Sequence, residues 1–251
     1  MKNRIYYILA LFSLTFSLSA QQGKESDRAW LIGAGLSANT VSGDWVDRYR
    51  ENYSVSAFVG RKFKSNYTLT AEWSYLFGGE VSDRQGALKN VFTPDGQLIN
   101  ISGSYGQVNI NQRGTYFNLG IEKTIPLGRL NKNSGLNIGL TGGYMWHWLN
   151  VDNVGNDSPQ IIDDYAKGYD RLGSGFLLRE SLGFIYLSPS RLVNFKLSFE
   201  ISQIWSQDLR KYYYPVGELS GEPQLNLLYG LKLNWYIPIY LGGKTEEYYY
   251  N

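Results

Sequence analysis

The sequence predicts an all-β protein, specifically an eight-stranded antiparallel up-and-down transmembrane β-barrel. Three observations lead to this prediction: an N-terminal export signal, repeated segments of about 10 residues in which apolar and polar side chains alternate, and connections that alternate between short and long. A tilted strand crosses hydrocarbon with about 9–11 residues, whose side chains point in turn to lipid and to the lumen.

The export signal occupies residues 1–20. Lys2 and Arg4 precede an uncharged, mostly apolar run of fourteen residues (5–18), and the small pair Ser19-Ala20 follows. The alternative, a membrane anchor, needs roughly 20 apolar residues, which this run does not reach. We therefore expect a signal peptide at 1–20 and a barrel domain at 21–251 that ends in a tail, 241–251.

Alternation with a period of two is the main evidence for strands. In residues 67–77, Leu69 and Trp73 share one face, whereas Thr70 and Glu72 share the other. This pattern predicts strands with one apolar face. The clearest segments are 67–77, 136–148, 194–202 and 227–239, and the weaker ones are 29–41, 53–63, 115–125 and 176–187.

One residue interrupts the alternation. Glu180 falls on the apolar face of segment 176–187, between Leu178 and Leu182. A β-bulge, or a position near the rim of the barrel, would account for a carboxylate there.

The connections between the predicted strands alternate in length. The short ones are 64–66, 126–135 and 188–192, and the long ones are 42–52, 78–114, 149–174 and 206–224. Long loops outside and short turns in the periplasm are the usual plan of barrels in the bacterial outer membrane, which is where we expect this chain.

The main alternative is a soluble antiparallel barrel or sandwich, such as a lipocalin-like cup, whose apolar faces would point inward. Alternation alone does not say which face is inside. The apolar faces end in aromatic residues, among them Trp73, Trp148 and Trp235, and this favours the membrane barrel.

Composition excludes several classes of function. The chain has 24 basic and 22 acidic residues, and two of the basic ones lie in the signal, so the mature chain is neutral. Without a basic run it is not expected to bind nucleic acid. It has no Cys, which excludes disulfides and a lipoprotein anchor. The acidic loop residues follow no calcium-loop spacing, so we expect neither metal nor cofactor.

The signal, the Tyr- and Gly-rich strands and the aromatic last strand resemble the small outer-membrane β-barrel proteins of Bacteroidota-type bacteria. More loosely, the chain is similar to OmpA/OmpX-type barrel domains. The resemblance implies contact with outer-membrane lipid and a role in the envelope, and some barrels of this kind serve the type IX secretion system. The tail 241–251 departs from barrels that stop at the aromatic residue closing the last strand.

Four charged residues are predicted to face the lumen: Glu72, Lys196, Glu200 and Lys232. The interior of an eight-stranded barrel is just wide enough for side chains to fill it, and unpaired buried charges are costly. We therefore expect a salt-bridged plug in the lumen. The alternative is a narrow ion path, which would make the protein a small pore.

His147 is the single histidine of the chain. A lipid-modifying barrel enzyme would need a histidine beside a serine, and Ser174 and Ser181 lie on or beside the next predicted strand. The preferred interpretation is a polar lumen or rim residue, and no catalytic residue is predicted.

Two loop segments combine aromatic and charged side chains in the way that contact surfaces do. Their residues are Tyr169, Asp170 and Arg171 in one loop, and Arg210, Tyr212, Tyr213 and Tyr214 in another. The alternative role for these aromatic residues is anchoring at the membrane–water interface. The predicted function is a non-enzymatic structural or interaction component of the envelope that binds a protein partner through its loops or tail.

Overall fold

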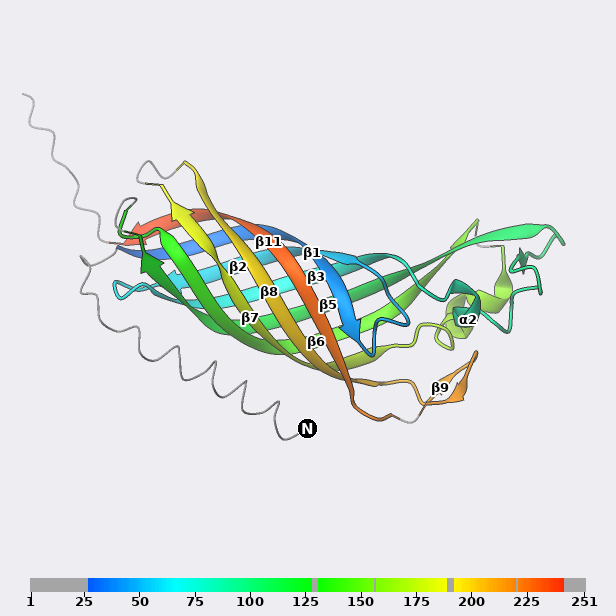
Figure 1. Ribbon diagram of the computed structural model, residues 1–251. Helices are drawn as coiled ribbons and strands as arrows, with labels where there is room; N and C mark the ends of the chain where they lie inside the picture. Colours follow the sequence, from blue (N-terminus) through cyan, green and yellow to red (C-terminus); the bar gives the residue numbers. More distant parts are fainter. Residues whose placement is uncertain (1–26, 128–130, 156, 189–191, 220, 242–251) are drawn as a thin grey trace, which may run out of the picture.

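Eight long antiparallel strands close into a barrel in the computed structural model of the chain (Figure 1). The structure describes residues 27–127, 131–155, 157–188, 192–219 and 221–241. The eight strands are β1 (Arg28–Gly43), β2 (Asn52–Lys62), β3 (Tyr67–Glu80), β5 (Tyr105–Pro126), β6 (Gly135–Val154), β7 (Gly173–Leu187), β8 (Asn194–Asp208) and β11 (Gln224–Leu241). The predicted signal peptide, and the tail beyond Leu241, lie outside the described residues.

The hydrogen-bonded ring follows the order β3-β2-β1-β11-β8-β7-β6-β5 and is closed by the pairing of β3 with β5. The predicted fold class is therefore confirmed. Each predicted segment coincides with one strand, although β5 and β6 run well beyond their predicted ends into the long loops. In these extensions Val108, Ile110 and Leu149 are buried in one apolar cluster with loop residues, and this packing keeps the hairpin ordered away from the ring.

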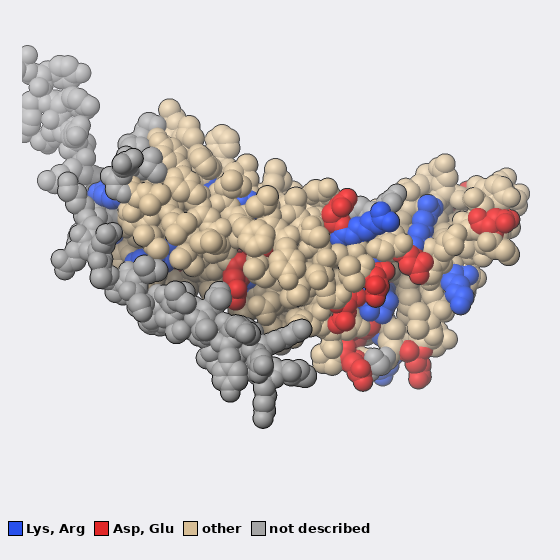
Figure 2. Space-filling view, viewed as in Figure 1, with Lys and Arg blue, Asp and Glu red and all other residues tan. Residues whose placement is uncertain are grey.

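The apolar faces point outward. Leu36, Leu119 and Leu231 are 62%, 57% and 60% exposed, whereas inward positions carry buried Ser, Thr, Asn and charged residues. The lipocalin-like alternative, which needs apolar faces inside, is therefore wrong. Figure 2 shows the outer wall almost without charge on the face in view, with the charged side chains gathered toward the loop end.

The register of β7 corrects both explanations offered for Glu180. Pairing of β7 is regular with β6 over Gly173–Ile185 and with β8 over its whole length, so no bulge is present at Glu180. Glu180 is the eighth of fifteen residues, which also places it far from either rim. Its neighbours Arg179 and Ser181 are buried in the lumen, and the carboxylate therefore lies on the outer wall.

The long loops lie beyond one end of the ring, beside the extended β5–β6 hairpin (Figure 1), and are here called the loop cap (residues 44–51, 81–104, 155, 157–172, 209–219 and 221–223). Its short elements are α2 (Arg84–Ala87), β4 (Leu98–Ile99), η1 (Pro159–Ile161), α3 (Asp163–Ala166), β9 (Tyr212–Tyr213) and β10 (Gly217–Glu218). Trp45, Leu88, Leu98 and Ile161 are almost completely buried and join a single apolar cluster with the strand ends. None of the described helices is long and apolar enough to span a membrane.

Candidate functional site

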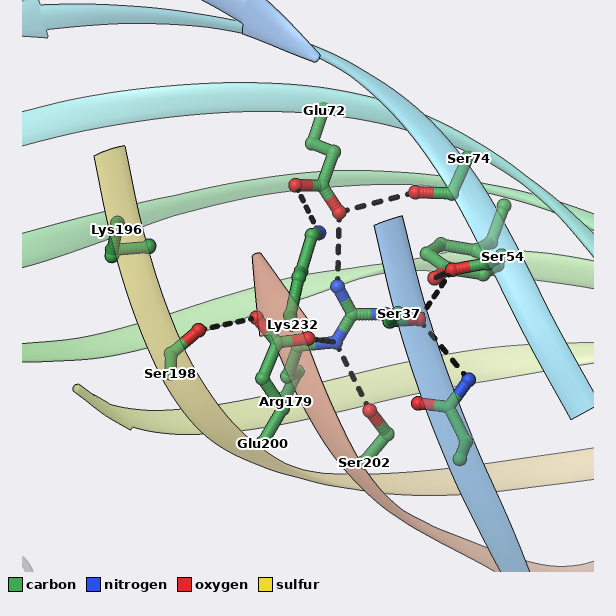
Figure 3. Close-up of polar contacts among 12 residues, drawn as sticks. Ser37, Ser54, Glu72, Ser74, Arg179, Lys196, Ser198, Glu200, Ser202 and Lys232 are labelled. Atoms are coloured by element: carbon green, nitrogen blue, oxygen red, sulfur yellow. Dashed lines mark hydrogen bonds and ion pairs between the residues drawn. The ribbon is translucent and has the colours of Figure 1, made fainter. Parts of the chain in front are cut away.

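A buried ionic cluster crosses the middle of the lumen (Figure 3). Lys232 Nζ lies 2.5 Å from Glu72 Oε2, and Arg179 Nη1 lies 2.9 Å from Glu72 Oε1. The same guanidinium reaches Glu200 with its Nε at 3.4 Å. These four side chains come from β3, β7, β8 and β11, so the cluster connects opposite sides of the barrel.

Lys196 does not join this cluster. Its Nζ lies 2.6 Å from Glu122 Oε1 on β5, and both side chains are buried. The structure thus brings Glu72, Glu200 and Lys232 together with Arg179, and pairs Lys196 separately with Glu122.

Sequence reasoning missed Arg179 and Glu122. Glu122 has the signal of a lumen residue, because it alternates with the outward Ile121. Arg179 has that signal too, because the apolar face of Leu178, Glu180 and Leu182 leaves Arg179 on the opposite face of the strand.

Arg179 is held by more than its two carboxylates. Its Nε donates to the Ser202 hydroxyl at 3.0 Å, and its guanidinium carbon lies 4.8 Å from the centre of the Tyr116 ring. The Tyr116 hydroxyl in turn lies 3.2 Å from the Ser54 hydroxyl. Bonds on several sides fix the guanidinium in one orientation, which is what a buried charge needs to be stable.

His147 is enclosed at the loop end of the lumen. Its Nε2 lies 3.2 Å from the hydroxyl of Ser206, which also accepts from the Asn226 amide at 3.0 Å. The Trp45 ring packs against the imidazole with 4.7 Å between centroids. His147 and Trp45 are 2% and 0% exposed, so neither lipid nor solvent reaches the imidazole.

The serine partners considered for His147 are therefore wrong. The Ser174 hydroxyl pairs with the Tyr144 hydroxyl at 2.8 Å. Ser181 lies beside Glu200 in the register of β7 and β8. The side chain that does contact His147 is Ser206, and this pair has no open path for an acyl substrate.

In the loop cap, two of the predicted contact residues are part of the interior. Tyr169 and Tyr213 are each 4% exposed, and the Tyr213 hydroxyl donates to the carbonyl oxygen of Ala87 at 3.2 Å. Burial raises the pKa of Tyr213 to about 12. These two rings hold the loops together and are not available to a partner while the cap is closed.

The charged residues of the predicted epitopes are paired within the cap. Arg210 donates to both carboxylate oxygens of Asp170, at 3.0 and 2.5 Å, and these hydrogen bonds raise the pKa of Arg210. Arg171 lies 3.7 Å from Asp208 and over the Tyr213 ring. Tyr212 and Tyr214 remain at the surface, 53% and 38% exposed.

Within the part of the chain that the structure describes, no three His, Cys, Asp or Glu side chains gather as a metal site would require. The described site is thus an ionic cluster inside a closed ring, covered by an ordered cap. Closed barrels with apolar exteriors are the β-structures that cross bacterial outer membranes, and the chain is a transmembrane barrel of this class.

No protein-family model matches the sequence, and no curated protein matches it. Among solved structures the fold is similar to Ail, the attachment invasion locus protein of Yersinia pestis, in complex with the heparin analogue sucrose octasulfate (TM-score 0.46, 8% identity, covering 84% of this chain and 99% of that one). It is also similar to Neisserial surface protein A (TM-score 0.40, 8% identity, 82% and 96%) and to the outer membrane protein OprG of Pseudomonas aeruginosa (TM-score 0.35, 8% identity, 86% and 98%). At these values the ligands of the neighbours do not transfer to this chain.

Proposed function

We propose that this protein is a non-enzymatic interaction component of the bacterial outer membrane, and that its loop cap binds a protein partner of the envelope. The observation that carries the proposal is the contrast between the inner side of the cap and its outer surface. Its inner side is a packed apolar core, whereas its surface presents Ile101, Tyr212 and Val216 at 79%, 53% and 69% exposure. Exposed aromatic and aliphatic groups on an ordered scaffold suit a protein contact.

The interior of the barrel does not favour either alternative function, a pore or a lipid-modifying enzyme. The ionic cluster of Glu72, Arg179, Glu200 and Lys232 joins strands on opposite sides of the lumen through paired charges, which disfavours the alternative of a pore. Enclosure of His147 behind Trp45 disfavours the alternative of a lipid-modifying enzyme.

The proposal is tested with a photo-crosslinking amino acid placed at Tyr212 or Tyr214 in cells that produce the protein. The matched control is Tyr67, an outward-facing residue of β3 at the end of the barrel away from the cap. We expect the same protein adduct from both cap positions and none from Tyr67. Adducts at Tyr67 only, or none at any position, would contradict binding through the cap.

A finer part of the proposal is that the partner belongs to an export machinery such as the type IX secretion system. The double substitution Tyr212→Ser and Tyr214→Ser leaves the buried Tyr213 in place and should reduce secretion of type IX cargo without lowering the amount of folded barrel. Unchanged secretion with loss of the cap adduct would retain the contact and refute the link to secretion.

A further inference from the structure

Glu180 places a carboxylate on the outer wall at the middle of a strand. Its register partners are Leu140 on β6 and Ile201 on β8, and Leu178 and Leu182 precede and follow it on the same face. Within the described ranges, no side chain forms a hydrogen bond or ion pair with it. A lipid-facing carboxylate without water or a counter-charge is unfavourable, and such residues mark functional contacts.

Gln203 extends this polar interruption toward the loop end. It lies two positions along β8 from Ile201, its register partners are Leu178 and Leu227, and it is half-buried on the outer wall. An acceptor and an amide thus lie close together on a wall that is otherwise apolar around them. Together they form a patch, here called the Glu180 face, that crosses β7 and β8.

A second copy of the chain does not supply the missing charge. The outward basic residues of the described strands are Arg28, Arg61, Arg113 and Lys123. Arg28, Arg61 and Lys123 lie toward strand ends, whereas Arg113 is opposite Phe77 near the loop end of β3 and donates to the carbonyl oxygens of Gly78 and Gln112. Arg61 and Lys123 are already placed over the rings of Trp30 and Tyr67. Two copies related by an axis along the membrane normal keep each residue at its own depth, so Glu180 would meet an apolar wall or another Glu180.

We propose that the Glu180 face is a lateral docking site for a different membrane-embedded protein that presents a lysine or arginine at the depth of Glu180. The ion pair formed there is shielded from water and selects the partner by its charge. Gln203 then bonds a polar group of the same partner. This contact lies in the plane of the membrane and is independent of the one proposed for the loop cap.

The first test measures the accessibility of Glu180 with dicyclohexylcarbodiimide, which dissolves in lipid and adds to membrane-embedded carboxyl groups. The purified barrel in phosphatidylcholine vesicles should be labelled, and Glu180→Gln should abolish that label. In native outer membranes we expect at least a fivefold lower labelling rate, because the partner covers the site. Equal rates in vesicles and native membranes would show lipid alone at this face and overturn the proposal.

The second test identifies the occupant. A photo-crosslinking residue at Leu182, with Val55 on β2 as the matched control on a distant part of the wall, should yield one adduct that is lost in Glu180→Leu. Glu180→Lys should also lose it, and exchanging the membrane-facing basic residue of the captured protein for glutamate should restore it. An adduct of two copies of this chain, or one that persists in Glu180→Leu, would refute the proposal.

The third measurement keeps folding apart from docking. In phosphatidylcholine vesicles, Glu180→Leu should raise the folding equilibrium constant about tenfold, because it removes the exposed carboxylate from hydrocarbon. A variant that is more stable alone and yet fails to form the adduct shows that Glu180 serves the contact. A less stable variant would show instead that Glu180 supports the barrel itself.

Discussion

Removing the Arg179 guanidinium should destabilise the barrel strongly. The substitution Arg179→Met keeps much of the side-chain volume but leaves Glu200, 7% exposed, without its ionic partner. Glu72 retains Lys232 at 2.5 Å, so one carboxylate is orphaned and not two. Breaking a buried pair from one side costs about 3–5 kcal/mol, and this is the expected loss in free energy of unfolding.

The assay is urea unfolding of the protein folded into phospholipid vesicles, followed by tryptophan fluorescence. Arg50→Met, at an exposed position in the loops, is the matched control and should change stability by less than about 0.5 kcal/mol. Adding Glu200→Gln to Arg179→Met should recover part of the loss, with a coupling energy of about 1–3 kcal/mol. A loss below about 1 kcal/mol for Arg179→Met, or strictly additive variants, would refute the role assigned to the cluster.

Three further predictions concern the cap and the lumen. Burial raises the pKa of Tyr49 and Tyr213 from 10.0 to about 12. The cap should therefore lose about 2–3 kcal/mol per ring as pH rises from 10 to 12, because the open form releases these protons first. The tyrosinate absorbance that is lost in Tyr49→Phe or in Tyr213→Phe should appear near pH 12, and its appearance near 10 would contradict burial of that ring. Arg210→Ala removes a partly exposed bidentate contact with Asp170 worth about 1 kcal/mol. Limited proteolysis of the cap should therefore be faster in Arg210→Ala than in the control Lys211→Ala. Equal rates of proteolysis would contradict the pairing. The wild-type protein should show no porin-like conductance in planar bilayers, and steady large steps would contradict the plug.

The candidate site was only partly predictable. Glu72, Glu200 and Lys232 could be assigned to the lumen because each occupies the polar phase of a clear alternation. The same alternation places Arg179 in the lumen, but its pairing with Glu72 could not be predicted, because the two residues are 107 apart in sequence and meet only across the closed barrel. Likewise, nothing in the loop sequence distinguishes the buried Tyr213 from the exposed Tyr212 and Tyr214.

The sequence alone determined the number and position of the strands, because side chains along a strand alternate with a period of two and each segment shows that period locally. Only the tertiary structure decided which face is outside, since alternation separates two faces of a strand without saying which of them points to the lumen. It also decided the partners across the lumen, because these depend on the register between strands far apart in the chain. For the same reason, Glu180 became an outward carboxylate only when regular pairing with β6 and β8 excluded a bulge.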